Sequence, residues 1–217
     1  HYAMAIWANG ANSKVIINGG KYVQEITGTD TQYDLIYASG KATIEIYGGT
    51  FQCATPQWTL NCLDNSGSKI YVMGGKFYKF NPAEPHVQPE GTEEIIVPEG
   101  YEVKKSGDWY SVVRKANAAF DAGNNGAYET LNDAITNASK DDNVSIKLPA
   151  ESTVTLDNGI ANESANAKDL TFVGDGTQTV DVVSKAINTE GGMLNYQRGS
   201  KFTFKNMTVQ AGEGDFD

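Results

Sequence analysis

The sequence contains few of the residues that most often carry chemistry in proteins. Only two histidines, His1 and His86, and two cysteines, Cys53 and Cys62, occur among its 217 residues. So small a supply of nitrogen and sulfur ligands makes a metal site the least favoured interpretation, and we expect neither a metal nor a cofactor. The spacing of the two cysteines leaves open whether they form a disulfide or stay as buried thiols.

Long hydrophobic runs and basic charge are also scarce. No apolar run approaches the roughly 20 residues that a membrane-spanning helix requires, so we expect no membrane insertion. The 17 lysines and arginines stand against 27 acidic residues, which gives a net charge of −10. Such a charge repels phosphate backbones and argues against nucleic-acid binding. The sequence also contains no P-loop and no dinucleotide-binding fingerprint.

A short block that returns three times is the strongest pattern in the chain. Each copy has two β-branched residues two positions apart, then a Gly-Gly pair, then an aromatic residue two positions after the second glycine. The glycine pairs are spaced by 29 and then by 26 residues. Alternation at period two indicates strands, and spacings of this size indicate repeats that bury their cores against neighbouring repeats. The three copies are residues 15–22, 44–51 and 70–77.

These features predict an all-β chain folded as a parallel β-helix, a solenoid of short strands. The glycine pairs are expected at the corners between sheets, because glycine accepts positive φ without strain. The aromatic residues Tyr22, Phe51 and Phe77 are expected to stack inside as a ladder. Shorter echoes upstream, at residues 6–10, 36–40 and 63–67, predict a further strand and turn in every coil. The alternative is an antiparallel sandwich that turns at the glycine pairs.

The end of the first half is marked by prolines and a hairpin pattern. Four of the six prolines lie between positions 82 and 98, which halts regular strand stacking. Residues 101–105 and 109–113 then flank a Ser-Gly-Asp turn and predict a β-hairpin. We expect this hairpin to plug the C-terminal end of the first set of coils.

The second half begins with the only convincing helical pattern. An apolar stripe over residues 127–139 predicts a short α-helix that caps the N-terminal end of further coils. We therefore expect three regions: the C-terminal coils of one β-helix in 1–114, a linker in 115–126, and a capping helix with the first coils of a second β-helix in 127–217. Since the pattern is already under way at residue 1 and still running at residue 217, we expect a segment of a larger repetitive protein.

The Gly-Gly-x-aromatic coils, the Phe80-Asn81-Pro82 segment and the hairpin up to Val113 resemble a known superfamily. It is the right-handed parallel β-helix superfamily with the pectate-lyase-like fold, and especially its secreted members from gut anaerobes and their phages. The resemblance spans residues 5–113, and more weakly 127–210. It implies a secreted or cell-surface protein, or a component of a phage particle. Because this fold hosts lyases, hydrolases, tail spikes and adhesins, it assigns no function by itself.

Aromatic residues outside the ladder are the candidates for a binding surface. Strand alternation places Tyr47 and Tyr71 on outward positions, where aromatic rings commonly stack on sugars. Tyr37 and Trp58 complete the predicted glycan-contact set, and Trp7 adds to the aromatic supply. The competing interpretation is that these rings pack against loops that cross the face.

No set of residues matches the carboxylate patterns of polysaccharide lyases or pectin hydrolases. The adjacent aspartates Asp141 and Asp142 follow the predicted helix, where a solvated turn explains them. We therefore predict no catalytic residue and no enzyme activity.

The leading interpretation is a non-catalytic extracellular β-helix module for adhesion or glycan contact, with a glycan or a host or bacterial surface as partner. The alternative is part of a polysaccharide lyase or glycoside hydrolase whose catalytic coils lie outside this segment. Carboxylates clustered on one exposed face of residues 15–77 would favour the enzyme, and a bare or aromatic face would favour the binding module. Formation of a homo-oligomer stays open.

Overall fold

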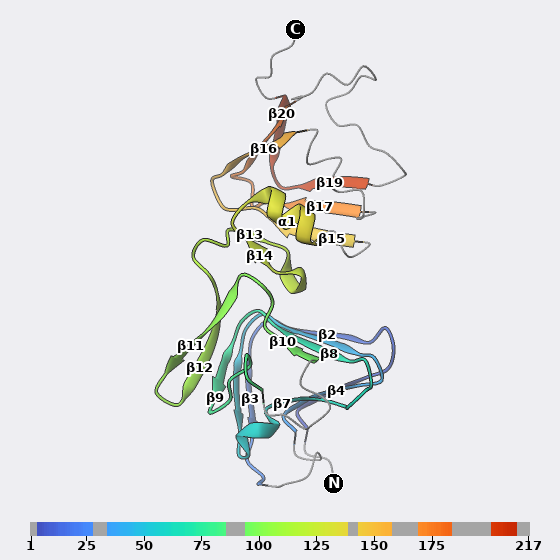
Figure 1. Cartoon of the computed structure of the whole chain (residues 1–217), viewed down its shortest axis with the longest axis vertical. Helices are drawn as coiled ribbons and strands as arrows, with labels where there is room; N and C mark the ends of the chain where they lie inside the picture. Colours follow the sequence, from blue (N-terminus) through green and yellow to red (C-terminus); the bar gives the residue numbers. More distant parts are fainter. Residues whose placement is uncertain are drawn as a thin grey trace. The chain divides into compact units, whose positions relative to one another are not determined.

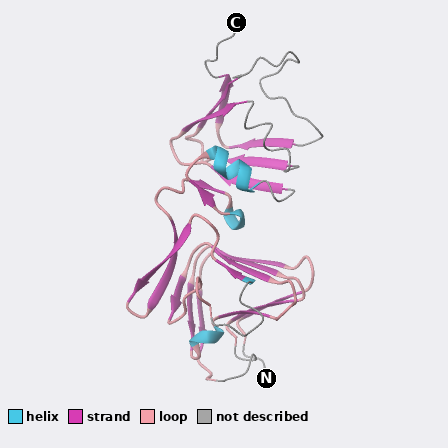
Figure 2. Cartoon of the chain, in the orientation of Figure 1, coloured by secondary structure: helices cyan, strands magenta, loops and turns pink. Residues whose placement is uncertain are grey.

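The computed structural model shows two compact units, His1–Lys115 and Ala116–Asp217. It describes residues 4–27, 34–85, 94–138, 143–157, 169–183 and 201–211 (Figure 1). Strands dominate both units, and the described residues contain one α-helix (Figure 2). The strands of each unit form a parallel β-solenoid that matches a right-handed β-helix, and the two units together have about five turns. The predicted fold class is therefore confirmed.

The first unit contains three coils of three strands each. Equivalent strands of successive coils pair in parallel, which gives the sheets β1-β4-β7, β2-β5-β8 and β3-β6-β9. A 3-10 helix, η2 (Pro56–Trp58), precedes the third coil. The coils are β1 (Ile6–Asn9), β2 (Lys14–Ile17) and β3 (Lys21–Gln24); β4 (Ile36–Ser39), β5 (Thr43–Ile46) and β6 (Thr50–Cys53); β7 (Leu60–Cys62), β8 (Lys69–Val72) and β9 (Lys76–Tyr78).

The aromatic residue after each glycine pair points inward and stacks on the next. The rings of Tyr22 and Phe51 lie 5.0 Å apart between centroids at an interplanar angle of 6°. The rings of Phe51 and Phe77 lie 4.8 Å apart at 9°. Phe51 and Phe77 are fully buried. The predicted ladder is thus confirmed, and the parallel pairing of the strands excludes the antiparallel sandwich.

In the second and third coils the two glycines of the corner are required for different reasons. The second glycines have positive φ, as predicted: +107° at Gly20, +117° at Gly49 and +103° at Gly75. The first glycines do not. A Cβ on Gly48 would instead lie 2.6 Å from the carbonyl oxygen of Asn18, and one on Gly74 would lie still closer to that of Tyr47. The first glycine therefore lets the backbone of the preceding coil approach closely.

The sequence pattern predicts the first strand of the third coil three residues too late in the chain. The strand of the third coil pairs Leu60 with Ile36, whereas the sequence pattern suggested Leu63 as its first residue. Leu63 follows β7 and is 48% exposed. Alignment on the glycine of the turn misplaces this strand, because the turn differs in length between coils.

The C-terminal end of the first unit adds strands to two of the sheets. β10 (Ile95–Ile96) pairs in parallel with β8. β11 (Tyr101–Ser106) and β12 (Trp109–Arg114) form the predicted hairpin, whose turn contains Gly107 at φ +59°. β12 pairs antiparallel with β9 and so continues the sheet past the last coil.

The second unit is built on two sheets, β14-β13-β15-β17-β19 and β16-β18-β20. β13 pairs antiparallel with β14 and β15, and the remaining pairs are parallel. The elements are β13 (Phe120–Asp121), η4 (Gly123–Asn125), β14 (Ala127–Tyr128), α1 (Leu131–Ala138), β15 (Asn143–Lys147), β16 (Thr153–Asp157), β17 (Asp169–Val173), β18 (Thr179–Val183), β19 (Lys201–Lys205) and β20 (Thr208–Ala211).

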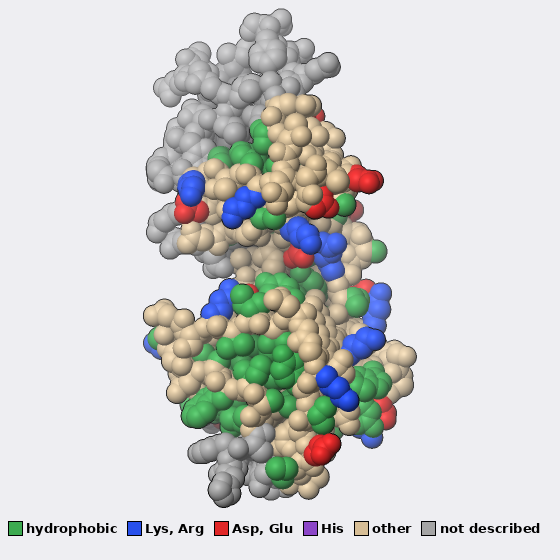
Figure 3. All heavy atoms as spheres, turned by 180° about the vertical axis from the view of Figure 1, so that it is seen from behind, with side chains coloured by type: hydrophobic (Ala, Val, Ile, Leu, Met, Phe, Trp, Pro, Cys, Tyr) green, Lys and Arg blue, Asp and Glu red, His purple; other side chains and the backbone are tan. Residues whose placement is uncertain are grey.

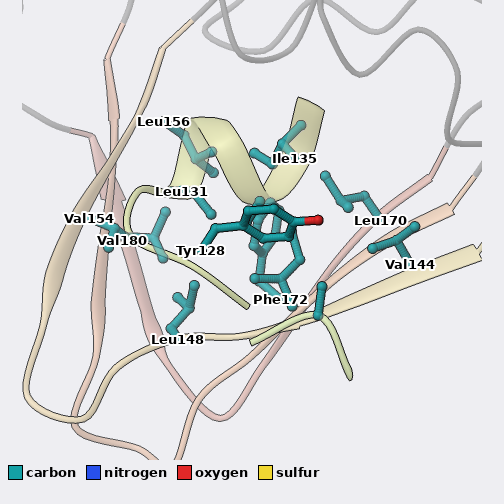
Figure 4. Close-up of a cluster of buried hydrophobic side chains, with 13 residues drawn as sticks. Tyr128, Leu131, Ile135, Val144, Leu148, Val154, Leu156, Leu170, Phe172 and Val180 are labelled. Carbon is teal, nitrogen blue, oxygen red and sulfur yellow. The ribbon is translucent and has the colours of Figure 1, made fainter. Parts of the chain in front are cut away.

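Helix α1 packs its apolar stripe onto the core of the second unit (Figure 4). Leu131 and Ile135 are buried there with strand residues such as Val144 and Leu170. Phe172 is fully buried, and its ring stacks on Phe204 with the centroids 5.3 Å apart. This core resembles that of the first unit in its stacked phenylalanines.

Two boundaries of the second unit differ from the sequence-based expectation. The helix begins at Leu131 rather than at residue 127, because the Thr130 side chain caps it: Oγ1 accepts a hydrogen bond from the Asp133 N–H at 3.0 Å. The segment expected to be a linker, 115–126, contains β13 and η4, and its Ala122 belongs to the buried core. Residues 116–126 therefore fold as part of the second unit.

Candidate functional site

The four predicted contact residues do not lie on one surface. Tyr71 lies on β8, and Tyr47 follows β5 in the same sheet. Tyr37 lies on β4, which belongs to a different sheet of the first unit. Trp58 ends η2 and is only 5% exposed, so its ring presents no face to a ligand. Trp58 is therefore removed from the candidate set.

Tyr47 and Tyr71 are brought together by a residue that the sequence interpretation did not select, Glu45. The register places Tyr71 beside Glu45 on neighbouring strands. The Tyr47 hydroxyl donates a hydrogen bond to Glu45 Oε2 at 3.2 Å, and Lys14 Nζ lies 2.7 Å from Glu45 Oε1. We call Lys14, Glu45, Tyr47 and Tyr71 the Glu45 surface.

Within the Glu45 surface the carboxylate is buried while its partners reach solvent. The Glu45 side chain is 3% exposed, against 52% for the Lys14 side chain and 40% for Tyr47. A buried carboxylate is tolerated when its oxygens are paired, and here each oxygen has a partner. The consequence is a tyrosine ring that is held in place at the surface by a charge-assisted hydrogen bond.

A second aromatic surface lies on the outer side of β1 and β4. Trp7 is 54% exposed and pairs in register with Tyr37, with ring centroids 6.4 Å apart at 46°. Trp7 Nε1 donates to Ser39 Oγ at 2.8 Å, and Ser39 Oγ donates to Asn9 Oδ1 at 3.1 Å. This chain of hydrogen bonds fixes the indole while leaving its ring accessible. We call Trp7, Asn9, Tyr37 and Ser39 the Trp7 surface.

Exposed apolar side chains are concentrated in the first unit. The space-filling view shows hydrophobic side chains gathered on one face of it (Figure 3). Patches of this kind often mark interaction sites in soluble proteins. The large hydrophobic side chains that are exposed in the first unit are Trp7, Ile16, Val23, Ile26, Tyr47 and Leu63.

Cys53 and Cys62 are buried thiols that are not joined in a disulfide, which answers the question that their spacing left open. Burial raises the pKa of both thiols, and the carboxylates of Glu94 and Asp34 raise that of Cys62 further. A protonated, buried thiol is a poor nucleophile. Neither cysteine therefore has the properties of a reactive residue.

The glutamate at the centre of the Glu45 surface could have been found from the repeat. Aligning the three blocks on their glycine pairs puts Ile16, Glu45 and Tyr71 at one outward position. Because Ile44 and Ile46 face inward, strand alternation turns Glu45 outward, where it lies beside Tyr71. The serine that orients Trp7 gives no comparable signal, since its role depends on a contact between coils.

Within the described ranges, no three His, Cys, Asp or Glu side chains are placed to hold a metal ion. The helix that the structure describes is too short and too polar to cross a membrane. Comparison of the chain with protein-family models, with curated proteins and with solved structures gives no match.

Proposed function

We propose that the chain is a non-catalytic β-helix module that contacts glycans, in a secreted or cell-surface protein or a phage fibre that serves adhesion. The observation that carries this proposal is the Trp7 surface. It offers an indole ring that is 54% exposed, held by Ser39, with a second aromatic ring beside it and the polar side chain of Asn9 next to it. Aromatic rings bind the apolar faces of sugars, and amide groups bind their hydroxyls.

The Glu45 surface supplies a second contact of similar chemistry. Its exposed Tyr47 ring lies near the half-exposed Lys14, whose ammonium group donates hydrogen bonds to hydroxyls, while the buried Glu45 holds both side chains in place. The net charge of −10 disfavours polyanionic glycans, so neutral glycans are the expected class.

The solenoid fold supports the proposal without selecting it. It is consistent with the pectate-lyase-like superfamily that the sequence resembles, which includes adhesins and phage fibres beside enzymes. Glycoside hydrolysis requires two carboxyl groups that face each other across a scissile bond. The two oxygens of Glu45 are instead bonded to Lys14 and Tyr47, which favours a binding role for this surface.

A glycan array combined with a reducing-sugar release assay tests the proposal. We expect binding to a neutral glycan, no release, and a loss of affinity of about tenfold or more for Trp7→Ala, which corresponds to about 1.4 kcal/mol. Ile26→Ala is the matched control, because Ile26 is equally exposed at 54% and lies outside both surfaces. Equal binding by Trp7→Ala and the unchanged chain, or release of sugar with turnover, would contradict the proposal.

A further inference from the structure

The first coil of the first unit has one side that no described strand covers. β1, β2 and β3 are the outermost strands of their three sheets, so no described strand pairs with the edge that faces away from coil 2. The inward residues Ile6 and Tyr22 of this coil are only partly buried, whereas their register partners Ile36 and Phe51 are fully buried. The open side of coil 1 therefore has the apolar character of a solenoid core.

Gly19 indicates what this side is built to receive. In coils 2 and 3 the first glycine of the corner is required because the carbonyl oxygen of the preceding coil lies against its Cα. Gly19 occupies the same position in coil 1 and does not have positive φ. Yet a Cβ on Gly19 would meet no atom of the described residues within 4 Å. Neither its conformation nor any observed contact accounts for a glycine at this position.

We propose that the open side of coil 1 binds a further coil of the same kind. That coil would pair in parallel with β1, β2 and β3, and the carbonyl before its own glycine pair would lie against Gly19, as the Tyr47 carbonyl lies against Gly74. Its aromatic residue would stack on Tyr22 and extend the ladder. This inference does not rest on glycan contact, since it concerns the end of the solenoid and not its outer faces.

The register of the known coils defines a probe. Ile6 pairs with Ile36 and Ile36 with Leu60, so Met4 is equivalent to Trp58. A copy of residues 34–57 joined directly to Met4 therefore supplies one more coil in phase with coil 1. Tryptophan fluorescence reports the thermal unfolding of the first unit alone, because all three tryptophans of the chain, Trp7, Trp58 and Trp109, belong to that unit.

Four proteins are compared: the chain and the extended chain, each with and without Gly19→Ala. We expect the added coil to raise the melting temperature of the first unit by about 5 °C or more, a shift typical of roughly 1 kcal/mol in a domain of this size. Gly19→Ala leaves the melting temperature of the unextended chain unchanged or slightly higher, because alanine fits that conformation. In the extended chain the same change removes most of the gain.

Three results would overturn the proposal. The first is an added coil that leaves the melting temperature unchanged. The second is a Gly19→Ala change that lowers the melting temperature equally in the chain and in the extended chain. The glycine would then serve a contact within the unit. The third is a concentration-dependent dimer of the unextended chain that Gly19→Ala abolishes, because the side would then bind a second copy.

Discussion

The two units share the solenoid architecture but differ in how much backbone and how much side-chain contact joins their coils. In the first unit the glycine corners let backbone carbonyls of one coil lie against the next, so the coils repeat closely and are visible in the sequence. Among the described residues of the second unit, Gly174 has a comparable approach, to the Asn206 carbonyl oxygen, and the coils also pack through buried side chains such as Phe172. A backbone contact requires a particular residue at each repeat, whereas a side-chain core accepts many apolar residues of similar volume. The comparison explains why only the first unit shows an obvious repeat.

The ends of the two sets of coils also differ. In the second unit α1 contributes Leu131 and Ile135 to the core at the first coil. In the first unit the hairpin β11-β12 and β10 extend the sheets after the third coil. The helix protects its sheet by covering apolar side chains, and the hairpin does so by continuing the hydrogen-bonded ladder.

The largest expected effect comes from breaking the aromatic ladder of the first unit. Phe51→Ala removes the ring that touches both Tyr22 and Phe77, and we expect it to cost about 3–5 kcal/mol of unfolding free energy. Urea unfolding followed by tryptophan fluorescence measures this loss. Phe51→Leu is the control and should lose less, since it keeps most of the buried volume. Equal losses in the two variants would mean that ring stacking is not what orders the coils.

The second prediction makes the matching change in the second unit. Ile135→Ala creates a cavity under α1 and is expected to cost about 2–5 kcal/mol there, because the side chain is fully buried. The fluorescence transition of the first unit should not move, while the circular-dichroism transition of the second unit should. Asn132→Ala, on the exposed side of the same helix, is the control. A shift of both transitions would show that the two cores do not unfold separately.

The third prediction concerns the glycine corner. Gly74→Ala places a methyl group against the Tyr47 carbonyl oxygen, so the coils must separate locally at a cost of about 1–3 kcal/mol. Fluorescence-detected unfolding again gives the value. If this variant proved as stable as the unchanged chain, close backbone approach would not be the reason for the first glycine of each corner.

The smallest expected effect depends on pH. Burial raises the pKa of the Glu94 carboxyl, with a further increase from Asp64, so the folded state disfavours the ionised form. Stability from this group is therefore present at low pH and declines as the pH rises through the raised pKa. We expect Glu94→Gln to be slightly more stable than the unchanged chain at pH 7, with the difference fading below about pH 4. Glu99→Gln, the same change at an exposed position, is the control.

The sequence was sufficient for the features that depend on local pattern. Strand alternation and the glycine pairs predicted the ladder of Tyr22, Phe51 and Phe77, and the Ser-Gly-Asp turn predicted the hairpin. Contacts between unlike side chains on neighbouring coils are not apparent from the sequence pattern. Glu45 was not selected, because its partner Lys14 lies on another coil and reaches it only through the register of β2 and β5.

A difference in turn length explains the error in the third coil, and a buried strand residue explains the error at the helix. The turn between β7 and β8 is longer than the turn between β4 and β5, so a pattern aligned on its glycine selects Leu63 where the structure uses Leu60. The apolar stripe predicts too early a start for the helix because Tyr128 fits its spacing. Tyr128 belongs to β14 and enters the core from that strand. A strand residue can match the helical spacing by chance, because its side chain enters the same core as the side chains of the helix.

The central claim is that successive coils of the first unit lie in parallel register, with their aromatic residues stacked face to face. Nuclear Overhauser effects between selectively labelled aromatic rings test it most directly. The structure predicts contacts between the Tyr22 and Phe51 rings, 5.0 Å apart, and between the Phe51 and Phe77 rings, 4.8 Å apart. It predicts no direct contact between Tyr22 and Phe77, because Phe51 lies between them. Absence of the Phe51–Phe77 contact in the folded protein would contradict the stacked arrangement of the coils.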